Sequence, residues 1–262
     1  MVATIQVNKQ SIKRLLESGK EQMFLIPEYQ RPYSWTENET KTLFYDLLEF
    51  TENESKKNSE VEGTYFLGSI VSYENEEGEQ EIIDGQQRIT SLFLLLRAIY
   101  TKLTSYEEKT VEQENFIRQI QPALWKQEKL TGEVDYTSVL ITSRVIDNEG
   151  NKILQDILET GIADHKRMDN YSKNYILFQR LFDKLCELSP TLMLEFIYYT
   201  LNKVVVFPIK TDSQDDALSV FSTLNDRGLP LSEADIFKAK MYNRIKKEYK
   251  KMFIKQWKNL SE

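Results

Sequence analysis

The sequence predicts a helix-rich α+β fold, in which a small mixed sheet with helices is followed by a helical subdomain. Glycine and proline are scarce, nine and six in 262 residues, so the elements are expected to be long and mostly helical. Short β-branched and aromatic runs at 64–73, 81–83 and 203–209 are typical of strands. Apolar residues recur at helical spacing over 89–103. At roughly 100–200 residues per domain, this length predicts one large domain or two small ones.

The first quarter of the chain predicts a strand, a helix, an extended loop and a second helix. Residues 3–7 alternate as a short strand, and Asn8 is expected to cap the helix that follows. Two prolines in MFLIPEYQRPYSW (23–35) exclude a helix and predict an extended loop. Thr36 and Glu39 have the spacing of a capping box, which opens the next helix.

A strand followed directly by a buried helix is predicted in the middle of the first half. TYFLGSIVSY (64–73) and the strand EII (81–83) are separated by an acidic turn, and helical periodicity begins after Gly85. The following helix is apolar on nearly every side, so we expect it to be central and buried. Its periodic apolar residues are Ile89, Leu92, Phe93, Leu96, Ile99 and Leu103.

The second half predicts mostly helix. A hairpin is expected around 135–150 and a strong strand at 203–209, followed by a helix to Leu224 capped by Asp212 or Ser213. Ser232 is expected to start the last helix. The chain therefore divides into a core (1–104), a mainly helical insertion (105–202) and a return segment (203–262) that packs on the core.

Composition excludes several classes of function. Lys+Arg total 34 against 41 Asp+Glu, a net charge of −7, which excludes a uniformly basic, sequence-independent DNA coat. One cysteine (Cys186) and one histidine (His165) exclude a disulfide framework and any site that needs two histidines. Without a signal-peptide pattern or an apolar run of about 20 residues, we expect a cytoplasmic protein that does not contact the membrane.

The segment IIDGQQR (82–88) has the composition of an anion site. Gly85 permits a tight turn, and the helix N-terminus after it offers unpaired N–H groups to a phosphate. Arg88 could bind the phosphate with its forked donors, and Asp84 could hold Mg²⁺ through its oxygens. Gln86 or Gln87 could orient a water. The alternative is a purely structural strand-to-helix connection.

The proline-stiffened loop IPEYQRPYSW (26–35) is suited to recognition. The rings of Tyr29, Tyr33 and Trp35 could stack on bases, each contributing about 1–3 kcal/mol. The alternative is a loop whose aromatic residues pack onto the core, with Arg31 in a structural ion pair.

Two features near the C-terminus could contact anions. In NDRG, Asn225, Arg227 and Gly228 could cradle an anion, with Lys238 nearby, although these residues also suit ordinary helix caps. Residues 238–258 carry nine Lys/Arg against one Glu, whereas 1–237 carry 25 basic and 39 acidic residues. This basic segment, expected to be a single final helix, could touch phosphates or simply be solvated.

Four motifs in this order resemble the N-terminal domain of the GmrSD-type (type IV) restriction endonucleases, a bacterial family with a ParB-like fold. They are IPEYQRPYSW (26–35), YFLGSIV (65–71), IIDGQQRITSL (82–92) and FSTLNDRGLPLSEADIFKAKM (221–241). The resemblance covers nearly the whole chain, although 105–200 carries no such motif.

The resemblance implies an NTPase whose activity is coupled to restriction of modified or phage DNA. Related domains bind and hydrolyse nucleoside triphosphates with a divalent cation such as Mg²⁺. Carried over by motif, the nucleotide site would comprise Asp84, Gly85, Gln86, Gln87 and Arg88, with Asp84 as the metal ligand.

The other motifs would complete this site. Asn225, Arg227 and Gly228 would close it. The 26–35 loop would contribute in two ways, with Gln30 and Arg31 facing the site or DNA and with Tyr29, Tyr33 and Trp35 shaping it.

Full-length relatives usually continue into an HNH-type nuclease domain. With a single histidine, this sequence cannot carry that nuclease site. We therefore expect either a piece of a longer protein or a sensor half that relies on a partner subunit to cut, with a homo-oligomer also open.

Three functional hypotheses follow. The leading one is an NTP-binding and hydrolysing sensor domain of a DNA-restriction system. A non-catalytic DNA- or partner-binding module is the second. An autonomous nuclease is the third and weakest, because no paired-carboxylate spacing stands out.

Overall fold

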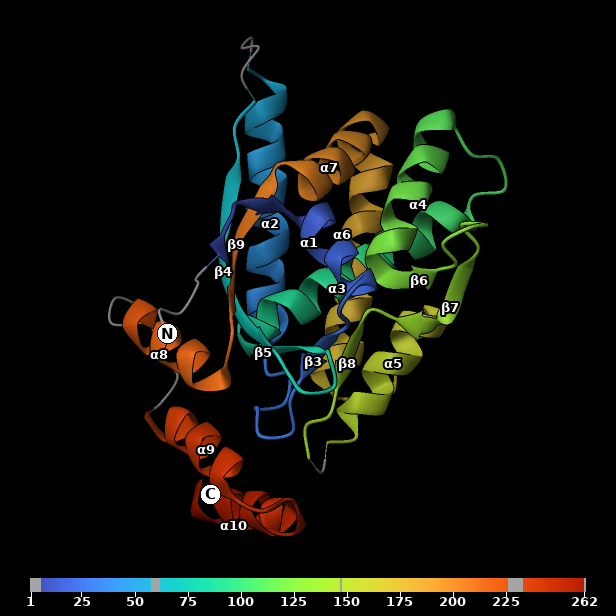
Figure 1. The fold of residues 1–262 in the computed structure, drawn as a ribbon. Helices are drawn as coiled ribbons and strands as arrows, with labels where there is room; N and C mark the ends of the chain where they lie inside the picture. The colour runs from blue at the N-terminus through green and yellow to red at the C-terminus, as the bar shows by residue number, and fades with distance from the viewer. Residues whose placement is uncertain (1–5, 58–61, 147, 226–232, 262) are drawn as a thin grey trace.

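A mixed β-sheet forms the centre of the protein in the computed structural model, which describes residues 6–57, 62–146, 148–225 and 233–261 (Figure 1). Its strands are β1 (Gln6–Val7), β2 (Gln10–Ser11), β3 (Phe24–Ile26), β4 (Tyr65–Glu74), β5 (Gln80–Asp84), β8 (Ile141–Ser143) and β9 (Val204–Thr211). The order across the sheet is β1-β9-β4-β5-β3-β8, and β2 also pairs with β9. A separate antiparallel pair is formed by β6 (Trp125–Gln127) and β7 (Val134–Val139).

The described residues contain ten α-helices, which confirms the predicted helix-rich α+β class. They are α1 (Ile12–Glu17), α2 (Glu37–Ser55), α3 (Gln86–Ser105), α4 (Val111–Leu124), α5 (Gly150–Thr160), α6 (Asn170–Leu188), α7 (Pro190–Asn202), α8 (Gln214–Asn225), α9 (Glu233–Arg244) and α10 (Lys250–Ser261). Over this part of the chain, no helix combines the length and the apolarity needed to cross a bilayer.

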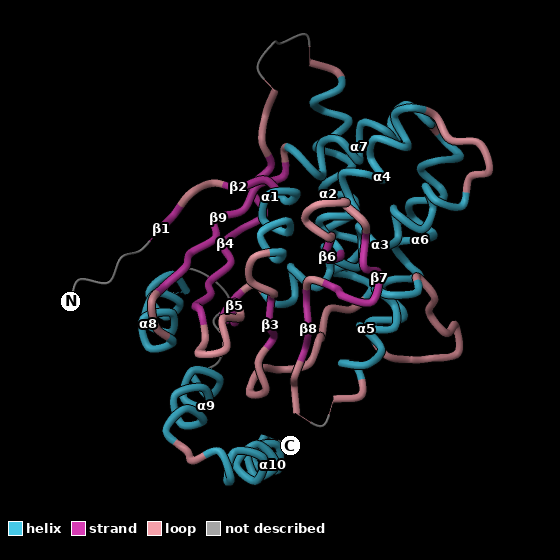
Figure 2. Tube along the Cα trace, turned by 45° about the vertical axis from the view of Figure 1, so that its right-hand side comes forward, coloured by secondary structure: helices cyan, strands magenta, loops and turns pink. Residues whose placement is uncertain are grey.

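The strand directions bring distant segments of the chain together. β4 and β5 are antiparallel and joined by a short turn, in which the Asn75 side chain accepts the N–H groups of Glu77 and Glu79. β9 pairs in parallel with β4, and β3 pairs in parallel with both β5 and β8. Figure 2 shows β3 and β8 side by side at the edge of the sheet. The segment 105–202, which was expected to be mainly helical, supplies β8 to this sheet.

Alternating side chains divide the interior into two cores, one on each face of the sheet. In β5, Ile82 belongs to the larger core and Ile83 to the smaller one; in β4, Ile70 and Val71 divide in the same way. The larger core is built around α3, and α8 covers the other face (Figure 1). The prediction that the helix after Gly85 is central and buried is confirmed, since most of α3 is buried.

Three local predictions differ from the structure. The first helix is capped by Ser11, whose Oγ accepts the Arg14 N–H at 3.4 Å, rather than by Asn8. The reason is that residues 10–11 first pair with β9 as β2, which delays the start of the helix.

The hairpin expected at 135–150 is formed instead by β6 and β7. Leu140 marks the transition, because its N–H bonds to Leu124 O at 2.9 Å while its carbonyl accepts the Phe24 N–H at 3.0 Å. These two bonds direct the chain from the small sheet into the large one, so β8 pairs with β3 and not with β7.

The single basic helix expected near the C-terminus is two helices, α9 and α10, separated by a 3₁₀ turn at Lys247–Tyr249. Lysines four residues apart, Lys246 with Lys250 and Lys247 with Lys251, span this junction. Like charges at this spacing destabilise a continuous helix.

Phe93 in α3 tests how much the fold depends on this helix. It is fully buried and contacts Phe24 edge-on, so we expect Phe93→Ala to lower the free energy of unfolding by about 3–5 kcal/mol. Leu130→Ala is the control, because Leu130 is 94% exposed and should change stability by no more than about 0.5 kcal/mol. Denaturant unfolding measures both, and equal effects would contradict the central place of α3.

Candidate functional site

A left-handed glycine joins β5 to the buried helix α3. Gly85 has φ 89° and ψ 7°, a conformation that residues with a Cβ rarely adopt. A Cβ added there would overlap with Ile70 Cδ1 and lie 3.2 Å from the Ser69 carbonyl oxygen. The turn is therefore compact, and it leaves the N-terminus of α3 without a side-chain cap. Such a terminus carries a partial positive charge and N–H groups that suit an anion.

Arg88 and Asp84 form an ion pair over this turn. Arg88 Nη2 lies 3.2 Å from Asp84 Oδ2, and Arg88 Nη1 donates to the Leu67 carbonyl at 3.3 Å. Both side chains are about one-quarter exposed, 24% and 27% respectively. The pair is thus fixed on the protein side and accessible from solvent.

Gly68 makes room for the Arg88 guanidinium. It has φ 129° and lies at an irregularity of β4, where the register against β9 shifts between Phe66 and Gly68. An added Cβ would overlap with Arg88 Nη1. Sequence reasoning did not assign Gly68 to the site, although a glycine inside a strand pattern often marks a bulge or a close approach.

Burial makes the ionised form of Asp84 less favourable. Desolvation raises the pKa of the Asp84 carboxyl above 3.8, and Arg88, the Gly85 N–H and Arg31 offset part of this rise. A cation or a further hydrogen-bond donor beside Asp84 would relieve the penalty. A shifted pKa on an accessible carboxylate is typical of functional sites, although structural ion pairs also produce it.

Gln87 and Gln30 hold the 26–35 loop against the turn. Gln87 Oε1 accepts the N–H groups of Ser34 at 2.7 Å and Trp35 at 3.2 Å, and its Nε2 donates to the Pro32 carbonyl at 3.3 Å. Gln30 Nε2 donates to the Ile83 carbonyl at 3.0 Å. Both amides are buried, so they fix the loop on β5 and α3.

Two aromatic residues expected to stack on bases are buried in the protein. Tyr29 donates to Glu81 at 2.7 Å and accepts from Gln214 at 2.7 Å, and its pKa is raised well above the ordinary value, mainly by burial. Tyr33 lies 2.6 Å from Ser91 Oγ, and burial raises its pKa to about 12. Buried rings cannot stack on bases, which corrects the stacking role, and the expectation that these tyrosines shape the nucleotide site stays a prediction.

The other predicted residues lie in different places. Trp35 is half-buried and packs against the larger core, and Arg31 is exposed near Asp84. Gln86 is buried in the first turn of α3. Lys238 is buried on α9 and Asn225 is the last residue of α8, whereas Arg227 and Gly228 lie outside the described residues.

A pocket of about 350 Å³ adjoins Arg88. It lies between α2 and the start of β4, and Trp35 and Arg88 line it together with Leu43, Asp46, Tyr65 and Leu67. Sequence reasoning missed Asp46 and Tyr65, because neither stands in a motif whose chemistry is evident and only the fold brings them beside Arg88.

The metal-binding side chains near Arg88 suit a divalent cation that arrives bound to a ligand. They do not suit a cation bound by protein side chains alone. Across the described ranges, no group of three or more His, Cys, Asp or Glu side chains could hold a metal ion. Mg²⁺ at a nucleotide is commonly bound through one or two carboxylates, with phosphates and waters as the other ligands. Asp84 alone fits that arrangement.

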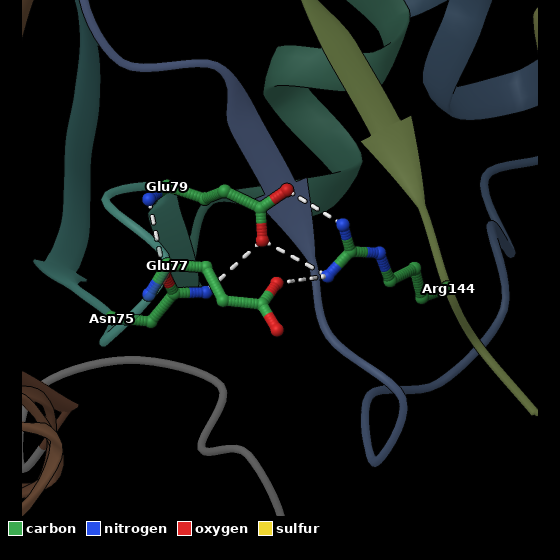
Figure 3. A network of polar contacts seen from close by, with 4 residues as sticks. All are labelled: Asn75, Glu77, Glu79 and Arg144. Carbon is green, nitrogen blue, oxygen red and sulfur yellow. Dashed lines mark hydrogen bonds and ion pairs between the residues drawn. The ribbon is translucent and has the colours of Figure 1, made fainter.

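A separate polar network braces the opposite end of β5 (Figure 3). Arg144 binds Glu79 through both guanidinium nitrogens, at 2.9 and 2.6 Å, and reaches Glu77 at 3.3 Å. Asn75 donates to Glu79 at 3.2 Å. This network joins the segment after β8 to the β4–β5 turn and lies away from Asp84.

Comparison with known proteins gives one family. The family model described as the GmrSD restriction endonuclease, N-terminal domain, matches residues 12–242. No curated protein matches the sequence.

Gly85 and Gly78 form a matched pair for testing the turn. Both have positive φ, but a Cβ at Gly78 would meet nothing within 4 Å. Gly78→Ala should therefore lower the free energy of unfolding only by the strain of a left-handed backbone, about 1–2 kcal/mol. Gly85→Ala should cost a further 1–3 kcal/mol or so, because the methyl group must displace Ile70. Denaturant unfolding measures both, and equal losses would show that the contact with Ile70 does not constrain the turn.

Proposed function

Because the chain belongs to the family of GmrSD restriction endonuclease N-terminal domains, we propose that it binds and hydrolyses nucleoside triphosphates as the sensor domain of a DNA-restriction system. The observation that carries this proposal is the Asp84–Arg88 ion pair at the uncapped N-terminus of α3. Such a site places two groups that bind phosphate, a helix N-terminus and a forked guanidinium, next to a carboxylate.

The phosphates would bind at the first turn of α3. The N–H groups after Gly85 and the Arg88 guanidinium would stabilise the charge that develops on the transferred phosphoryl group. Arg88 is already oriented by Asp84 and by the Leu67 carbonyl. Phosphate binding would therefore cost little side-chain entropy at Arg88. This favours a mechanism in which catalysis comes from positioning the phosphates.

Asp84 would hold a divalent cation beside these phosphates. When bound, Mg²⁺ neutralises charge on the phosphate oxygens. Ionised Asp84 bears an unfavourable desolvation energy in the folded protein, and a cation would compensate it.

Of the two glutamines, Gln86 is the better candidate to orient the attacking water. The Gln87 amide binds the 26–35 loop through both its oxygen and its nitrogen. Gln87 would therefore act by holding the loop, in which Arg31 and Gln30 flank the site. Asn225, Arg227, Gly228 and Lys238 remain proposed contributors from the C-terminal segments.

Hydrolysis in this proposal is coupled to restriction of modified or phage DNA in the cytoplasm. Cutting would be performed by an HNH nuclease domain or a partner subunit, and a homo-oligomer is compatible with this scheme. Phosphate release from GTP, ATP, CTP and UTP with Mg²⁺ tests the proposal, with and without DNA. Absence of both binding and release would overturn it.

A non-catalytic DNA- or partner-binding module is the second candidate, favoured by exposed basic side chains on the last two helices. Lys240 and Arg244 on α9 and Lys251 and Lys255 on α10 are exposed. This function predicts DNA binding that survives Asp84→Ala and weakens steeply with salt, because phosphate contacts release counterions. Filter binding or anisotropy at two salt concentrations distinguishes it from the NTPase.

Arg88→Ala should weaken NTP binding about tenfold or more, because a hydrogen bond to a charged group contributes about 1.5–3 kcal/mol and 1.4 kcal/mol is a factor of ten. Gly68→Ala should act in the same direction by displacing the guanidinium without removing it. Arg118→Ala is the control, because Arg118 is an exposed arginine of α4 paired with Glu114. Calorimetric titration measures all three, and unchanged affinity in Arg88→Ala would refute the site.

Asp84→Asn should separate activity from stability. Since the folded-state pKa of Asp84 is raised, the folded protein binds the proton more tightly, and its stability falls as pH rises from below 3.8 through the folded pKa. Asp84→Asn lacks this fall, so at neutral pH it should be at least as stable as the unmodified protein while hydrolysing NTP about tenfold or more slowly. Unfolding and phosphate release across pH measure both, and a wild-type stability advantage that grows with pH would contradict the assignment.

A further inference from the structure

A polar pocket lies at the end of β5 opposite Asp84, where β4 and β9 end and β5 begins. Its volume of about 450 Å³ is within the range of small-molecule sites, roughly 300–1,000 Å³. We call the space lined by Gln22, Ser72, Glu74, Gln80, Lys210 and Asp212 the β4–β9 pocket.

The strand register places three oxygen-bearing side chains in one row of this pocket. Glu74 pairs with Gln80 across β4 and β5. On the other side of β4, Tyr73 pairs with Thr211 of β9, so Asp212 comes next to Glu74. Two carboxylates and one carboxamide therefore lie side by side, and over the described residues neither carboxylate belongs to an ion pair.

Gln80 contributes a buried acceptor that the protein does not use. Its side chain is 1% exposed, and its Nε2 donates to Ser72 Oγ at 2.8 Å. Its Oε1 is buried without a hydrogen-bond partner among the described residues. An unsatisfied buried acceptor costs folding free energy, so a ligand that donates a hydrogen bond to Gln80 would recover part of that cost.

Lys210 adds a positive charge to the same pocket. It pairs with Ser72 in the register of β9 and β4, two residues before Asp212, and its Nζ donates to Gln22 Oε1 at 3.4 Å. The Gln22 amide nitrogen in turn donates to Glu74 Oε2, which leaves Oε1 of that carboxylate for another donor. The pocket thus presents a cation next to two anions.

We propose that the β4–β9 pocket binds a free amino acid. The ammonium group of the ligand would bind Asp212, Glu74 and Gln80, and its carboxylate would bind Lys210. An alkylammonium group has three N–H donors and no acceptor, which matches two carboxylates and one carboxamide oxygen. A metal ion matches this row less well, because across the described ranges no three His, Cys, Asp or Glu side chains could hold one.

Titration calorimetry of the whole chain with each standard amino acid tests this inference. At least one should bind with millimolar affinity or better. Its N-trimethyl derivative keeps the positive charge but has no N–H, and its decarboxylated amine keeps the ammonium group but has no partner for Lys210. Each should bind about tenfold or more weakly, because each loses hydrogen bonds to charged groups.

Two variants test the two ends of the pocket separately. Glu74→Gln should weaken amino-acid binding about fivefold or more, because charge-assisted hydrogen bonds are roughly twice as strong as neutral ones. Lys210→Met should weaken amino-acid binding about tenfold but should leave the affinity for the decarboxylated amine unchanged or higher.

Glu76→Gln is the matched control, because Glu76 is an exposed acid of the same β4–β5 turn that does not line the pocket. It should leave amino-acid affinity unchanged, and circular dichroism melting should show all three variants folded.

Failure of every amino acid to bind would show that solvent alone satisfies Gln80 and would overturn the proposal. Equal affinity for the N-trimethyl derivative, or an affinity unchanged by Glu74→Gln, would overturn it as well. Arg88→Ala should leave amino-acid binding unchanged, so this inference and the proposed NTP site stand or fall independently.

Discussion

The candidate site depends on the burial of most of α3, which begins immediately after a left-handed glycine. A helix that is apolar on nearly all sides must lie in the core, and it can follow β5 directly only if the turn occupies almost no space. Gly85 meets that requirement against Ile70. The helix N-terminus is consequently held in one position at the end of the sheet, and Asp84 and Arg88, one residue before and three residues after Gly85, are placed with it.

The 26–35 loop is arranged around this fixed turn by side-chain amides rather than by a sheet. Pro27 and Pro32 have no backbone N–H and interrupt a strand ladder, so the other backbone polar groups of the loop must be satisfied in another way. Gln87 accepts two of its N–H groups and donates to Pro32, while Gln30 bonds back to β5. Two glutamines thus connect the loop, the strand and the helix into one unit, and the buried tyrosines fix it from beneath.

Much of this arrangement could be predicted from local signals, and the rest required long-range pairing. The capping box at Thr36, the strand before Asp84 and the buried periodicity of α3 are local, and the structure contains each of them. The switch of Leu140 between two sheets, Gly68 beneath Arg88, and Asp46 beside it depend on residues far apart in the sequence. The aromatic residues of the 26–35 loop were misleading as a sign of base stacking. Tyr29 and Tyr33 suit both recognition and burial, and the residues that pack around them determine that both are buried.

Several features that cost folding free energy are concentrated at one corner of the molecule. A carboxylate with a raised pKa, the positive-φ glycines Gly68 and Gly85 and a half-buried guanidinium lie together where β4 meets the turn from β5 to α3. A connection with only a structural task could use a solvated cap and a continuous strand at lower cost. Because such costs persist where binding or catalysis requires them, their coincidence with the Arg88 pocket favours a ligand site over a structural turn. In the Arg144 network, by contrast, each charged group is paired with an opposite charge, and the evident effect of the network is to brace the sheet edge.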